Sequence, residues 1–150
     1  MRTHRVSTLR KLSERWSRRI CATAATLAVA SCATVDTAVV ANPGAGFSLA
    51  VGKSATISGT DYRITFNRVT EDSRCPVDVQ CVWAGDAKIE LTVARNGAPD
   101  DTRVISLTPP NSEATVGNVK IRFVSLAPTP RQSEPPAARP YVARLMVLAP

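Results

Sequence analysis

The sequence almost lacks histidine. His4 is the single one, and it lies in a basic stretch at the N-terminus. Without a second histidine further along, a Ser-His or Cys-His nucleophilic arrangement cannot be built in the rest of the chain. A zinc site around two cysteines would lack the remaining ligands of its tetrahedron. A glycine-rich phosphate-binding motif is also missing. We therefore expect no enzymatic activity, no metal site and no cofactor.

Aromatic residues are scarce, at 5% of the chain, and this scarcity argues against an extended stacking platform for sugars or nucleic-acid bases. The formal net charge is +7, but seven of the nineteen basic residues lie in the first nineteen positions. From Cys32 onward there are twelve basic and eleven acidic residues. The positive charge belongs to the N-terminal segment, so we expect no nucleic-acid partner.

The chain also lacks an apolar run long enough to span a membrane. The uncharged run Ile20–Ala30 would rise about 16 Å as a helix, against a bilayer core of about 30 Å. A basic segment before it and small residues after it are typical of an export signal. The sequence from Leu27 to Cys32, L-A-V-A-S-C, resembles a bacterial lipobox. We therefore predict a signal peptide over residues 1–31 and lipidation of Cys32.

Two alternatives to this processing stay open. Ordinary signal cleavage further along the chain is one of them, because small-residue sites are common. The other concerns the route of export, since Ser17-Arg18-Arg19 resembles part of a twin-arginine signal. The expected location is the cell envelope, at the outer membrane or in the periplasm if the cell has an outer membrane. If the lipobox is processed, the chain is attached to the membrane through the lipid of Cys32.

Residues 32–46 are small and irregular and predict a flexible tether, with a short edge strand over Val35–Val40 as the alternative. From Phe47 the hydrophobic period becomes two, which is typical of strands with one buried face. The clearest run places Ala87, Ile89, Leu91 and Val93 on one side. We predict an antiparallel β-sandwich, Ig-like or a partly open barrel, with about seven or eight strands over residues 47–150. The proline-rich stretch 128–140 is expected to connect strands.

Cys75 and Cys81 lie in a short loop between two predicted strands. In an exported protein this pair is expected to form a disulfide. A thioredoxin-like redox pair would need closer spacing and a βαβ context.

The loop around these cysteines is the candidate binding site. Its polar residues serve either recognition or the architecture of a tight loop, and architecture is the favoured interpretation. Arg74 is expected to pair with Asp72, Asp78 or Asp86, and Trp83 is expected to fill the core beside the disulfide. The candidate residues are Asp72, Arg74, Pro76, Val77, Asp78, Gln80 and Trp83.

The string D-S-R-C-P-V-D-V-Q-C-V-W-A-G-D-A, from Asp72 to Ala87, is preceded by an I-T-F-x-R-V strand. It resembles a domain of small bacterial envelope proteins, often lipoproteins, whose function is not established. The similarity extends from Phe47 to the C-terminus and includes L-A-P-T-P at Leu126 and Y-V-A-R-L-M-V at Tyr141. The resemblance implies a β-rich periplasmic or surface domain, and it supplies no catalytic residue.

Three functions are compatible with these features. The favoured one is a non-enzymatic interaction or structural module of the envelope with a protein partner. The second is an inhibitor of an exported protease or lysozyme, acting through the Cys75–Cys81 loop. The third is a glycan- or peptidoglycan-binding module. The sequence leaves the oligomeric state undetermined.

Overall fold

The computed structural model describes residues 38–135 and 139–148. The predicted signal peptide, Cys32 and residues 33–37 lie outside these ranges. Within them the chain forms nine strands: β1 (Val39–Ala41), β2 (Gly46–Ala50), β3 (Ser54–Ile57), β4 (Tyr62–Asp72), β5 (Ala87–Arg95), β6 (Asp101–Ser106), β7 (Glu113–Val116), β8 (Val119–Ala127) and β9 (Val142–Leu148).

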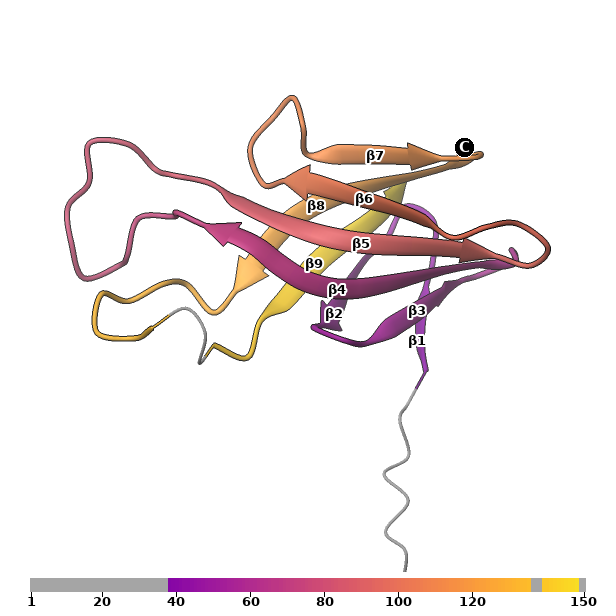
Figure 1. The fold of residues 1–150 in the computed structure, drawn as a ribbon, viewed down its shortest axis with the longest axis horizontal. Coiled ribbons are helices and arrows are strands. Elements are labelled where there is room, and N and C mark those ends of the chain that lie inside the picture. The colour runs from indigo at the N-terminus through magenta and orange to yellow at the C-terminus, as the bar shows by residue number, and fades with distance from the viewer. Residues whose placement is uncertain (1–37, 136–138, 149–150) are drawn as a thin grey trace, which may run out of the picture. The chain divides into compact units, whose positions relative to one another are not determined.

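The strands form two sheets that pack against each other (Figure 1). One sheet has five strands in the order β1-β3-β4-β5-β6, and the other has four in the order β2-β9-β8-β7. All neighbouring strands run antiparallel except β1 and β3. This arrangement confirms the all-β sandwich that the sequence predicts. The described residues contain no helix that is long and apolar enough to span a membrane.

The core lies between the sheets and follows the period-two pattern of the sequence. In β5, Ala87, Ile89, Leu91 and Val93 are buried while the residues between them are partly exposed. Alternate side chains of a strand point to opposite faces, so one face of β5 is apolar throughout. The buried side chains of both sheets form one continuous cluster, which includes Phe66 from β4 and Phe123 from β8.

Two bulges in β4 change which of its residues face inward. The register with β5 shifts between Phe66 and Arg68, and again between Val69 and Glu71. Each extra residue resets the alternation and bends the strand. As a result Val69 packs against the core, and the side chain of Asp72, at the end of the strand, is only 2% exposed.

The N-terminal boundary of the folded part differs from the expected one. The stretch 32–46 was predicted as a tether, but Val39–Ala41 within it is a strand paired in parallel with β3. Ala41 is fully buried, and this burial explains why the short segment is held. The alternative of an edge strand over Val35–Val40 agrees with β1 at Val39 and Val40, and residues 35–37 of that prediction lie outside the described ranges.

Candidate interaction site

The segment between β4 and β5, residues 73–86, forms a loop that we call the stapled loop. It extends beyond the ends of the sheets (Figure 1). Cys75 and Cys81 are joined by the predicted disulfide, with their Cα atoms 6.0 Å apart. At its base the backbone N–H of Ser73 donates to Asp86 O (2.8 Å), and that of Cys75 donates to Ala84 O (2.9 Å). The stem of the loop is thus a short two-stranded ribbon closed by a covalent bond.

Gly85 is required by this stem. Its φ is +69°, in the left-handed region that favours glycine. A Cβ at this position would lie 1.8 Å from the carbonyl oxygen of Ser73. No side chain fits there, so the close approach of the two sides of the stem depends on glycine.

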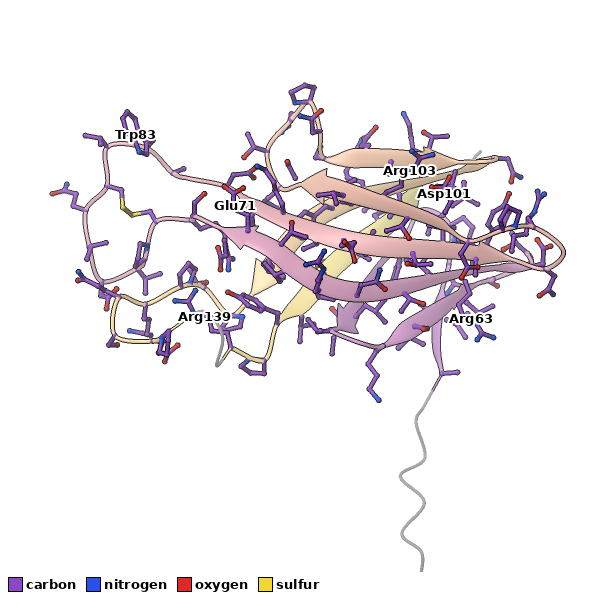
Figure 2. The ribbon with its side chains drawn as sticks, in the orientation of Figure 1. Arg63, Glu71, Trp83, Asp101, Arg103 and Arg139 are labelled. Carbon is purple, nitrogen blue, oxygen red and sulfur yellow. A yellow bond between two sulfur atoms is a disulfide. The ribbon has the colours of Figure 1, made fainter. Side chains whose placement is uncertain are left out.

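Residues 79–83, which we call the tip of the stapled loop, expose apolar side chains to solvent. Val82 is 88% exposed and Trp83 is 79% exposed. Val77 and Val79 on the same loop are also exposed. Trp83 projects from the periphery of the loop, away from the sheets (Figure 2). The expectation that Trp83 fills the core is therefore wrong: the core is occupied by other aromatic side chains, among them Phe66 and Phe123, and the loop carries Trp83 beyond the reach of the sheets.

A buried ionic cluster lies where β4 ends, and we call it the Asp72 cluster: Asp72, Arg74, Arg139 and Tyr141. Arg74 donates to both carboxylate oxygens of Asp72, from Nε to Oδ1 at 2.7 Å and from Nη2 to Oδ2 at 2.9 Å. Arg139 Nη1 donates to Oδ2 at 3.3 Å, and the hydroxyl of Tyr141 donates to the same oxygen at 2.9 Å. The side chains of Arg74 and Arg139 are 11% and 6% exposed.

These contacts set the protonation state of Asp72. Burial by itself would raise the pKa of this carboxyl group, but the hydrogen bonds from Arg74 and Tyr141 outweigh burial and hold its pKa below the ordinary value. Burial is the main reason that the pKa of Tyr141 is raised. Asp72 is therefore a carboxylate acceptor and Tyr141 a neutral donor at pH 7, which is the combination that their hydrogen bond requires.

The Asp72 cluster also joins the stapled loop to the proline-rich loop between β8 and β9 (residues 128–140, of which 136–138 lie outside the described ranges). Arg74 donates from Nη1 to the carbonyl of Leu126 and from Nη2 to that of Pro128 at 3.0 Å. Arg139 Nη2 donates to Arg131 O (3.1 Å) and Glu134 O (2.6 Å). Two segments far apart in the sequence are thus fixed to one carboxylate.

Direct contacts between the two loops extend this connection. The backbone N–H of Val77 donates to Pro130 O at 3.0 Å. The carboxylate of Asp78 accepts from the backbone N–H of Gln132 at 2.9 Å. At the other side of the stem, Asp86 Oδ1 accepts from the N–H and the hydroxyl of Thr108, each at 3.0 Å. The stapled loop is therefore held at its base and along one flank, while Val82 and Trp83 at its tip are exposed to solvent.

The seven candidate residues fall into two groups. Asp72, Arg74 and Asp78 make the contacts that hold the loops, and of the three partners expected for Arg74 the structure selects Asp72. Pro76 is partly buried, whereas Val77, Gln80 and Trp83 are exposed. Cys32, the predicted lipidation site, lies outside the described residues.

Sequence reasoning missed three residues of this region. Arg139 and Tyr141 are separated from Asp72 by 67 and 69 positions, and no local pattern indicates such contacts. Val82 could have been identified, because it stands beside Trp83 and lies outside both predicted strands.

A groove lies next to the Asp72 cluster, with a volume of about 590 Å³. It is lined by residues 68–72 of β4, by residues 50–51 at the end of β2 and by residues 139–142 before and at the start of β9. We call it the edge groove.

In the part of the chain that the structure describes, no cluster of three or more His, Cys, Asp or Glu residues is arranged to hold a metal ion.

Both carboxylate oxygens of Asp72 accept hydrogen bonds from the cluster, so the cluster is suited to holding the two loops rigidly and less suited to acting as a reactive group.

No protein-family model, no curated protein and no solved structure matches this chain. The functional argument therefore depends on the exposed tip, the buried cluster and the edge groove.

Proposed function

We propose that this chain is a non-enzymatic lipoprotein of the bacterial cell envelope that binds a protein partner through the stapled loop. The observation that carries the proposal is the exposure of Val82 and Trp83, 88% and 79%, at the tip of a loop whose base is fixed. Large apolar side chains gathered at one exposed place are typical of interaction sites. Tryptophan is also among the residues that contribute most to binding energy at protein interfaces.

The rigidity of the loop supports the same proposal. The Cys75–Cys81 disulfide, the ribbon of the stem and the bonds to Pro130 and Gln132 order the backbone before any partner arrives. A segment that is already ordered loses little conformational entropy on binding. The small apolar area of the tip can then give useful affinity.

The location rests on the sequence. The basic segment, the uncharged run and the lipobox-like L-A-V-A-S-C support export and attachment through Cys32. The Cys75–Cys81 disulfide agrees with an oxidising compartment outside the cytosol. The partner is then a protein of the envelope or of the extracellular side.

Inhibition of an exported protease or lysozyme is the second candidate. Its specific support is that the stapled loop extends past the ends of both sheets (Figure 1), as a loop that enters an active-site cleft must. In this case Val77 and Gln80, exposed on the same loop, would also contact the enzyme.

Site-specific photo-crosslinking in intact cells tests the main proposal. A photoreactive amino acid at position 83 is expected to give one reproducible adduct with an envelope protein, and an unlabelled excess of the soluble domain should compete with it. The matched control is position 104, because Val104 is 54% exposed on β6. Equal labelling from positions 83 and 104, or no adduct from either, would refute recognition through the tip.

Two further assays separate the alternatives. A panel of secreted proteases and lysozymes measures inhibition, which Val77→Ala and Gln80→Ala should abolish without changing the melting temperature if the second candidate holds. Retention on a peptidoglycan column that Trp83→Ala removes would instead support glycan binding, because an exposed indole ring can stack on a sugar.

A further inference from the structure

The edge groove lies beside an unpaired stretch of β4. Strand β3 pairs with β4 only from Arg63 to Thr65, and the last backbone contacts on that side join Phe66 to Gly52 and Lys53. Beyond this point, within the described ranges, residues 67–72 of β4 pair with β5 alone. A strand edge without a neighbour presents N–H and C=O groups that another extended chain can pair with.

The lining of the groove shows that it follows this edge. All five residues from 68 to 72 line it. These residues belong to the part of β4 that has no neighbour on the side of β3, so the groove lies beside the unpaired edge. Five residues of strand span about 16 Å.

The opposite wall of the groove is largely apolar. It contains Val51, which is 41% exposed, together with Ala50, Pro140 and Val142. An extended chain that paired with β4 would direct every second side chain toward this wall. Such a combination of backbone pairing and side-chain contacts is the mode of recognition known as strand addition.

Contacts at both ends of the unpaired stretch of β4 limit the length of chain that can pair with it. At one end, residues Gly52 and Lys53 already pair with Phe66. At the other end, Arg139 and Tyr141 reach Asp72. The two bulges in β4 also interrupt regular pairing. The unpaired edge of β4 covers only residues 67–72, so a short peptide segment fits better than a whole sheet.

Arg139 indicates which chemical group an occupant would place at the Asp72 end of the edge groove. Its side chain is only 6% exposed, and its buried Nε–H has no hydrogen-bond acceptor among the residues that the structure describes. A buried polar group without a partner is uncommon and destabilising. In addition, the guanidinium groups of Arg74 and Arg139 share the single carboxylate of Asp72. A second carboxylate would therefore be favoured here by both hydrogen bonding and charge.

We propose that the edge groove binds a short extended peptide segment of a partner protein, paired with β4 and ending in a carboxylate held by Arg139. This carboxylate accepts from the Nε–H of Arg139, while Nη1 and Nη2 keep their contacts to Asp72, Arg131 O and Glu134 O. The site is separate from the tip of the stapled loop, so it can be tested independently of the function proposed above.

The probe is the acetylated hexapeptide TVTVTV with a free C-terminal carboxylate, titrated into the isotope-labelled domain and followed by NMR. We expect progressive shifts and slowed exchange of the backbone amides of residues 68–72. The Nε–H resonance of Arg139 should shift as well. The C-terminal amide of the same peptide should bind about tenfold more weakly, because it lacks the charge.

Three results would overturn the proposal. The first is the absence of any shift at millimolar peptide. The second is equal binding of a peptide with proline in place of the central valine, since proline cannot complete the backbone pairing. The third is equal binding of the acid and the amide, which would remove the role assigned to Arg139.

A substitution in the apolar wall provides a test that leaves the Asp72 cluster intact. Val51→Asp introduces a charge into the groove at an exposed turn position, and it should weaken peptide binding by about tenfold or more. Val104→Asp, at a similarly exposed valine on β6, should have no effect. Equal effects of the two substitutions would contradict binding in the groove.

Discussion

The hydroxyl of Tyr141 donates to Oδ2 of Asp72 at 2.9 Å, across 69 positions of sequence. Asp72 ends a strand of the five-stranded sheet, and Tyr141 immediately precedes β9 of the four-stranded sheet. This one hydrogen bond therefore connects the two sheets at the end of the sandwich that carries the stapled loop.

Asp72→Asn is expected to be strongly destabilising. The substitution leaves the buried guanidinium groups of Arg74 and Arg139 without their carboxylate, and the loss of one partner of a buried ion pair typically lowers stability by about 3 kcal/mol or more. Urea unfolding measures the change. Asp78→Asn is the control, because Asp78 is exposed, and its effect should stay below about 1 kcal/mol. Equal losses for the two variants would contradict the importance of the Asp72 cluster.

The contribution of Asp72 should depend on pH. Its pKa is lowered in the folded protein, so its stabilising effect is present above the unfolded-state pKa, about 3.9, and is lost as the pH falls through the lower folded-state value. The stability difference between the native protein and Asp72→Asn should be largest near neutral pH and shrink in strong acid. Urea unfolding at a series of pH values gives this difference. A difference that grows on acidification would show that the sign is wrong.

Gly85→Ala should be far more damaging than Gly97→Ala. Both glycines have positive φ, +69° and +76°, so alanine is strained at either position by about 1 kcal/mol or slightly more. At Gly97 a Cβ meets no atom within 4 Å, whereas at Gly85 it meets Ser73 O at 1.8 Å. We expect a loss of roughly 3 kcal/mol or more for Gly85→Ala, from strain and steric overlap together. Thermal unfolding of the two variants makes the comparison, and equal melting temperatures would refute the close approach in the stem.

Loss of the disulfide should weaken the fold moderately without abolishing it. The closed loop of Cys75 and Cys81 is short, and the chain-entropy model gives about 2 kcal/mol for such a loop. The double variant Cys75→Ser/Cys81→Ser should therefore unfold at lower urea concentration with an unchanged far-ultraviolet circular dichroism spectrum. Complete loss of the β-sheet spectrum would show that the sandwich depends on the disulfide much more than we infer.

Trp83 should fluoresce as a residue in contact with water. The sequence contains two tryptophans, Trp16 and Trp83, so a protein that begins at Cys32 reports on Trp83 alone. With Trp83 79% exposed, its emission should be red-shifted, and soluble quenchers should reach it in the folded state about as well as after unfolding. Blue-shifted emission that moves to longer wavelength on unfolding would place the ring in the interior instead.

Local pattern was sufficient to predict much of this fold. The alternation from Ala87 to Val93 defines β5 because each inward residue is apolar and each outward one tolerates water. The Cys75–Cys81 bond was predicted from the expected export of the chain and from the lack of residues that could complete a metal site with those sulfurs. Both predictions depend on residues that lie close together in the sequence, so a single sequence contains the necessary information.

The remaining features depend on contacts that local pattern does not encode. The pairing of Arg139 with Asp72 joins residues 67 positions apart, and an arginine between alanine and proline gives no sign of burial. The sequence also gives no sign of the two bulges in β4. Asp72 becomes an inward residue only because the register shifts twice before it. Trp83 was expected inside because large aromatic rings are usually buried; its exposure depends on how far the loop extends, which is a property of the folded chain.

The closed stem of the stapled loop also has a consequence for the variability of the protein. Gly85, the disulfide and the Asp72 cluster fix the two sides of the stem, whereas Val82 and Trp83 are among the most exposed apolar side chains of the described chain. Substitutions at the tip are therefore expected to leave the scaffold intact. If the proposed function holds, they would change what the domain recognises, and new binding specificities could be selected by randomising a few loop positions.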